Sequence, residues 1–68
     1  MYHRTSINGE KILFKWDGNH EAQMINEDTK EVLDISEIGD YEKPKAHIGD
    51  FIAYVDYMIR LELRGLTQ

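Results

Sequence analysis

The sequence predicts an α+β domain: a small antiparallel β-meander of three to four strands, followed by one C-terminal amphipathic α-helix packed on the sheet. Three turn signals divide the first half into short stretches rich in β-branched and aromatic residues. Beyond Pro44, the spacing of apolar residues changes from two to about 3.6, which is typical of a helix. The 68 residues suffice for one domain, and a chain this short buries only about 60% of the surface that it exposes when unfolded.

The first turn signal is the pair Asn8-Gly9. Both central residues of a type I′ turn need positive φ, which asparagine and glycine tolerate, so residues 2–7 and 10–16 are expected to pair as a hairpin. This register places six side chains on one face, which their apolar character marks as the inner one: His3, Thr5, Ile7, Ile12, Phe14 and Trp16.

The second connection is expected to be the three-residue loop 17–19. With that length, Ala22 and Met24 lie on the inner face, whereas a loop of two or four residues would place Glu21 and Gln23 there. Because a shift of one residue moves every side chain of a strand to the other face, burial favours the three-residue loop.

The third connection is expected to be the four-residue loop 27–30, which continues the inner face into a fourth strand through Leu33 and Ile35. An alternative is a short helix over residues 29–38, because the segment beginning Asp28-Thr29-Lys30-Glu31 can also be interpreted as a capping box. The β-branched and apolar residues after this segment favour the strand.

A helix is expected from about residue 45 to residue 64. Pro44 is acceptable in its first turn, Arg64 suits the negative end of the helix dipole, and Gly65 can supply a left-handed cap. Gly49 costs roughly 1 kcal/mol relative to alanine inside a helix, so the first turn is expected to fray or to begin later. The predicted organisation is one domain over residues 1–68, with the meander in 1–35, the connection in 36–46 and the helix in 47–65.

The apolar residues of this helix span an arc of about 200°, whereas packing on one sheet needs a stripe of only about 100° or somewhat more. Part of the helix is therefore expected to stay exposed unless a second surface covers it. The expected anchors for a partner are Tyr54, Met58 and Leu61, and the simplest cover is the same helix of a second copy, which makes a homodimer. In the alternative, a two-layer monomer, these side chains skirt the sheet edge under residues 36–46.

The net charge of −5 is concentrated in the middle of the chain. Residues 21–42 hold eight carboxylates against Lys30, a net charge of −7. Within this segment a carboxylate recurs at every third residue, at Asp28, Glu31, Asp34, Glu37 and Asp40. One interpretation is a solvated face that keeps a small protein soluble. The other is a surface that steers the chain toward a basic protein, in the extreme case by mimicking nucleic-acid charge as small inhibitors of the viral counter-defence type do.

The chain has few nucleophilic side chains and no histidine or cysteine motif for a metal, and its many carboxylates are not by themselves evidence of acid–base catalysis. The chain has no cysteine, so no disulfide and no thiolate zinc site is expected. His3, His20 and His47 are too far apart in sequence to form a histidine-pair motif. A chain this small has little volume for a catalytic pocket. We therefore expect no enzyme activity, no cofactor and no metal. Because no signal peptide and no apolar run near the roughly 20 residues of a membrane span is present, a cytoplasmic location is expected.

The expected function is that of a non-enzymatic protein-interaction module, a small acidic regulator or inhibitor whose C-terminal helix and acidic segment bind a protein with a basic surface. One alternative is single-stranded nucleic-acid binding through the outer sheet face, where Tyr2, Arg4, Lys11 and Lys15 combine aromatic and basic groups. Phosphate repulsion by the acidic segment makes nucleic acid the less favoured partner. The other alternative is a purely structural homodimerisation domain.

Overall fold

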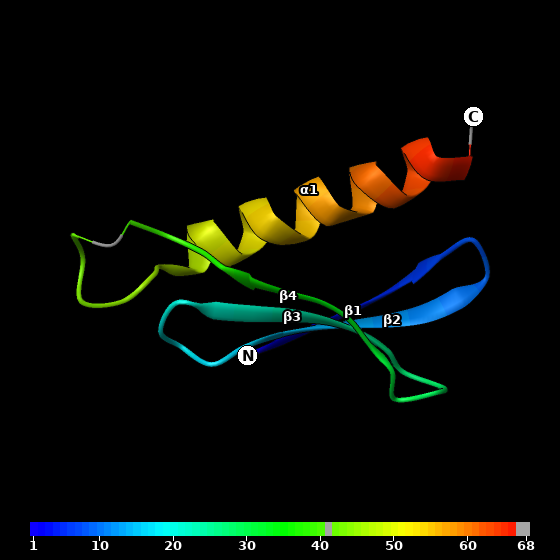
Figure 1. Ribbon diagram of the computed structural model, residues 1–68, viewed down its shortest axis with the longest axis horizontal. Coiled ribbons are helices and arrows are strands. Elements are labelled where there is room, and N and C mark those ends of the chain that lie inside the picture. Colours follow the sequence, from blue (N-terminus) through cyan, green and yellow to red (C-terminus); the bar gives the residue numbers. More distant parts are fainter. Residues whose placement is uncertain (41, 67–68) are drawn as a thin grey trace.

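The computed structural model describes residues 1–40 and 42–66 and confirms the predicted α+β fold. Its elements are β1 (Tyr2–Ile7), β2 (Glu10–Trp16), β3 (Glu21–Asn26), β4 (Val32–Glu37) and α1 (Ile48–Leu66). The strands form one antiparallel sheet in the order β1-β2-β3-β4, and α1 lies across one face of it (Figure 1). The predicted connection and domain also include Tyr41, Thr67 and Gln68, which lie outside the described residues.

The first hairpin has the predicted turn and register. Asn8 and Gly9 both have positive φ, at 57° and 82°, as a type I′ turn requires. Ile7 lies opposite Glu10, and the pairing continues along β1 and β2 without irregularity. Ile7 is buried, so the face assigned to the core from the sequence is the inner face of the structure.

The connection between β2 and β3 differs from the predicted loop 17–19. Trp16 lies opposite Ala22, so β3 is displaced by two residues from the predicted register. The backbone N–H of Asp17 donates to the carbonyl of Glu21 at 3.3 Å and extends the pairing beyond the strands. Because the displacement is even, the side chains of β3 keep their predicted faces, and Ala22 is fully buried.

The third connection is a turn over residues 27–30, as predicted, and β4 is a strand rather than the alternative helix. The N–H of Asn26 donates to the carbonyl of Glu31 at 2.8 Å across this turn. Lys30 has a φ of 66°, a left-handed conformation that closes the turn.

The prediction that Leu33 and Ile35 face the core is wrong. Ile25 pairs with Val32, but the next residue back, Met24, pairs with Asp34, so Leu33 is an extra residue in a β-bulge. From Asp34 onward, the bulge therefore exchanges the side chains of β4 that face the core with those that face outward. Leu33 and Ile35 are consequently 42% and 59% exposed.

The core lies between the inner sheet face and α1. T-shaped packing places the rings of Phe14 and Tyr54 5.9 Å apart, and Trp16 stacks on Phe51 at the same centroid distance. The buried apolar residues come from the sheet, the connection and the helix: Ile7, Ile12, Phe14, Ala22, Met24, Ile38, Ala46, Phe51, Tyr54 and Val55.

The helix begins at Ile48, later than residue 45, which agrees with the cost expected for Gly49. The N–H of His47 donates to the Asp50 carboxylate at 2.8 Å and holds the start of the helix. At the other end, α1 continues through Gly65 to Leu66, so the predicted left-handed cap at Gly65 is wrong.

The segment before α1 is tied to the β2–β3 connection. The N–H of Ile38 donates to the carbonyl of His20 at 2.6 Å, and the N–H of Ala46 donates to the carbonyl of Asn19 at 2.9 Å. The His20 ring nitrogens lie 2.9 Å from the Ile38 carbonyl oxygen and 3.3 Å from that of Lys43. These contacts fix where the helix starts over the sheet.

Candidate protein-interaction surfaces

The sequence predicts Tyr54 as an exposed anchor for a partner, and the structure corrects this. Its side chain is only 7% exposed, and its hydroxyl donates to Oδ2 of Asp34 at 2.8 Å. Ser36 donates to the same oxygen at 2.7 Å. Burial and the neighbouring Asp34 carboxylate raise the pKa of the Tyr54 phenol above its ordinary value. Asp34 is therefore an internal acceptor rather than part of an exposed acidic face.

The two other predicted anchors lie farther from the core. Met58 is half-buried, and Leu61 is 39% exposed. The helix also exposes apolar side chains on both sides of its buried stripe: Ile48, Ile52 and Leu63 on one flank, Tyr57 and Leu61 on the other. The helix thus presents more apolar surface than its own sheet covers.

A groove with a volume of about 400 Å³ lies between α1 and the end of β4. It brings together three of the predicted partner-binding residues, Glu37, Tyr54 and Met58. The remaining lining residues are Ser36, Ile38, Gly39, Asp50, Ala53 and Tyr57. Sequence reasoning missed these six, and the available signal was the small size of residues such as Gly39 and Ala53, which leave space where a strand and a helix meet.

The predicted acidic ladder is split by the fold. Asp28 and Glu31 are exposed near the β3–β4 turn, whereas Glu37 and Asp40 are exposed at the opposite end of β4. The length of the strand separates the two groups by roughly 20 Å. Glu21 lies opposite Glu37 in the sheet and adds negative charge at the end that adjoins the groove.

The outer sheet face, defined here as the side chains of β1 to β4 that point away from α1, carries Tyr2, Arg4, Lys11 and Lys15 as the register predicted. Arg4 forms an ion pair with Glu27 at 3.2 Å. The Lys15 ammonium lies 5.9 Å from the centre of the Tyr2 ring. Carboxylates of β3 and β4 share this face, so its basic groups do not form a uniformly positive surface for phosphates.

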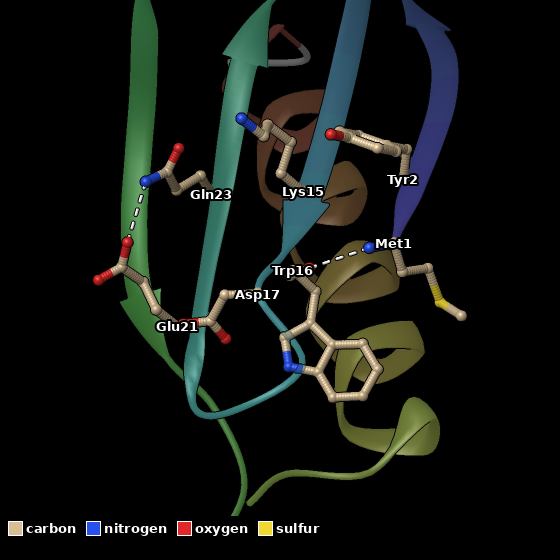
Figure 2. A pocket seen from close by; sticks show the side chains of 7 residues that line it. All are labelled: Met1, Tyr2, Lys15, Trp16, Asp17, Glu21 and Gln23. Atoms are coloured by element: carbon tan, nitrogen blue, oxygen red, sulfur yellow. Dashed lines mark hydrogen bonds between the residues drawn. The ribbon is translucent and has the colours of Figure 1, made fainter.

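One end of the outer sheet face is hollowed, with a volume of about 230 Å³ (Figure 2). The N-terminal ammonium of Met1 donates to the carbonyl of Trp16 at 3.0 Å and holds β1 against β2 at this end. Gln23 donates to the Glu21 carboxylate at 3.0 Å on its other side. The lining residues are Met1, Tyr2, Lys15, Trp16, Asp17, Glu21 and Gln23.

The histidines lie on separate parts of the fold: His3 on β1, His20 in the β2–β3 connection and His47 before α1. Within residues 1–40 and 42–66, no three or more histidine and carboxylate side chains are grouped so that they could hold a metal ion. The same part of the chain has no helix with the length and apolar character needed to cross a membrane.

A scan against protein-family models and searches of curated proteins and of solved structures found no match.

Proposed function

We propose that this chain is a non-enzymatic protein-interaction module, a small acidic regulator or inhibitor that binds a basic segment of another protein in the groove between β4 and α1. The observation that carries the proposal is the composition of this groove. The apolar residues Met58 and Tyr57 line the same groove as the acidic residues Glu37 and Asp50. A complementary segment would combine apolar side chains with arginine or lysine.

The charge distribution favours the same kind of partner. Residues 21–42 carry a net charge of −7, and the end of β4 that adjoins the groove lies beside Glu21 and Asp40. A field of this sign accelerates encounters with basic surfaces and disfavours acidic ones. Tyr57 is 61% exposed at the groove and is the aromatic side chain best placed to act as an anchor.

A more specific form of the proposal is nucleic-acid mimicry. The two acidic groups at the ends of β4 are separated by roughly 20 Å along one strand. In a partner that binds nucleic acid, these carboxylates would occupy positions otherwise taken by phosphates. Such binding would weaken steeply with added salt and would compete with an oligonucleotide for the partner.

The proposal is tested by titrating the intact, ¹⁵N-labelled chain with a short extended peptide that alternates arginine and leucine. We expect the largest chemical-shift changes at Gly39, Ala53 and Tyr57, which line the groove. A peptide that alternates glutamate and leucine is the matched control and should bind at least about tenfold more weakly, a difference of about 1.4 kcal/mol.

Two neighbouring helix substitutions locate the site. Ala53→Arg places a bulky cation in the groove and should abolish peptide binding, whereas Ile52→Arg adds the same charge on the other flank of α1 and should not. Equal binding of both peptides, or equal losses for both variants, would contradict the proposed site.

A further inference from the structure

We propose that the outer sheet face is the interface of a homodimer in which two copies of this chain pack sheet against sheet. Helix α1 covers only the inner face (Figure 1). On the outer face, Ile35 is 59% exposed and Val32 is 49% exposed, and they lie opposite Gln23 and Ile25 of β3. The bulge at Leu33 turns Ile35 outward, so the fold itself adds apolar surface to this face.

The charges on this face are complementary to those of a second copy. The basic side chains lie on β1 and β2, and the acidic ones lie on β3 and β4. The basic set is Arg4, Lys11 and Lys15, and the acidic set on the strands is Glu21 and Glu37. Glu27, in the turn after β3, pairs with Arg4 of its own chain. A two-fold axis parallel to the strands places β1 over β4 and β2 over β3 of the partner, which brings opposite charges together. An axis across the strands would place each strand over itself and oppose like charges.

The same two-fold arrangement matches the apolar side chains. Leu13 and Ile25 are cross-strand neighbours, so the axis places Leu13 over Ile25 of the second copy, and the reverse contact follows by symmetry. Ile35 of one copy then lies over the β1 end of the other, where the hollow beside Tyr2 and Lys15 can receive it (Figure 2).

The size of the face sets the expected strength of the dimer. Four strands of about six residues cover roughly 20 by 20 Å. This area, roughly 400 Å² per copy, is about half that of a standard specific interface and is typical of weak, transient ones. We therefore expect monomer and dimer to exchange at micromolar concentrations rather than to form a permanent assembly.

Sedimentation of the intact chain at increasing concentration provides the first test. The mass should rise from 8.0 kDa toward twice that value. Ile35→Asp should weaken dimerisation at least about tenfold, because it buries a carboxylate in an apolar contact. Ile52→Asp is the matched control, since Ile52 is 61% exposed on α1, and it should have no effect. A chain that stays monomeric, or a larger loss for Ile52→Asp than for Ile35→Asp, would overturn the proposal.

A pair of charge reversals tests the two-fold arrangement itself. Lys15→Glu and Glu21→Lys should each dimerise at least about tenfold more weakly than the unchanged chain, because each opposes like charges twice in a symmetric dimer. An equimolar mixture should recover dimerisation, since the carboxylate introduced at position 15 of one variant then lies near the ammonium introduced at position 21 of the other. Both variants keep a negative net charge, so overall attraction does not explain recovery. A mixture that associates no better than its components would refute this interface.

Discussion

At the scale of single residues, the contact between Tyr54 and Asp34 distinguishes this fold from the one that the hydrophobic pattern predicts. An acidic side chain faces the helix from an edge strand, and it is stabilised there by hydroxyl donors from Tyr54 and Ser36 at 2.8 and 2.7 Å. Hydrogen bonds to a charged acceptor are stronger than those between neutral groups. Tyr54 therefore joins the helix to β4 instead of facing a partner.

Removing the Tyr54 hydroxyl should destabilise the protein. In Tyr54→Phe, the half-buried Asp34 carboxylate loses one of its donors, and the free energy of unfolding should fall by about 1.5–3 kcal/mol. Urea unfolding measures this loss. Tyr57→Phe is the control, because the Tyr57 side chain is largely exposed, and its effect should stay within about 0.5 kcal/mol. Equal stability of the two variants would show that the Tyr54–Asp34 contact contributes little.

The raised pKa of Tyr54 predicts a loss of stability in alkaline solution. In the unfolded chain this phenol ionises near pH 10, whereas in the folded chain it stays protonated to higher pH. The unfolded state then binds fewer protons than the folded state, so the free energy of unfolding falls as the pH rises above about 10. Tyr54→Phe should lack this part of the slope. Urea unfolding of the unchanged chain and of Tyr54→Phe between pH 8 and pH 11 measures this difference. The same dependence of stability on pH for both proteins would contradict the prediction.

At the scale of elements, the parts of the fold that the sequence predicted are those with strong local signals. Asn8-Gly9 specified both the first turn and its register, and Pro44 with the apolar repeat located the helix. The β2–β3 register was less predictable, because a displacement by two residues keeps the same faces buried.

The orientation of β4 could not be predicted from its sequence pattern. Val32, Leu33 and Ile35 have the character of core residues, yet the bulge at Leu33 gives the inward positions to Asp34 and Ser36. Edge strands tolerate such bulges because one side of the strand lacks a neighbour to pair with. The apolar arc of α1 likewise does not show which part of the helix the sheet covers. The pattern therefore predicts an exposed Tyr54, whereas the Tyr54 ring packs on the buried Phe14 of β2.

The connection between β4 and α1 should tolerate little change at Gly39. This residue has a φ of 87°, and an added Cβ would lie 2.8 Å from the Cβ of Ala46. Gly18 has the same φ, but an added Cβ would meet nothing within 4 Å. Gly18→Ala should therefore cost about 1 kcal/mol of backbone strain, and Gly39→Ala should cost clearly more. Thermal or urea unfolding of the two variants compares them directly, and equal losses would contradict the predicted clash with Ala46.

At the scale of the whole molecule, β4 separates two surfaces with different proposed partners. On its inner side, Ser36 lines the groove against α1, which we propose binds a basic segment. On its outer side, Ile35 extends the face that we propose joins two copies. Both surfaces depend on the reversed alternation that the bulge imposes. A dimer through the outer sheet face would leave both grooves accessible, so one assembly could present two of them.

Both proposed surfaces therefore depend on the orientation of β4, which single-cysteine labelling measures. The chain has no cysteine, so Ile35→Cys and Ser36→Cys each carry one thiol. In dilute solution, where the chain is monomeric, the thiol at position 35 should react at least about tenfold faster than the one at position 36, because thiol reactivity follows exposure. In concentrated urea the two rates should become equal. Faster labelling at position 36 in the folded protein would place Ile35 in the core and contradict this orientation of β4.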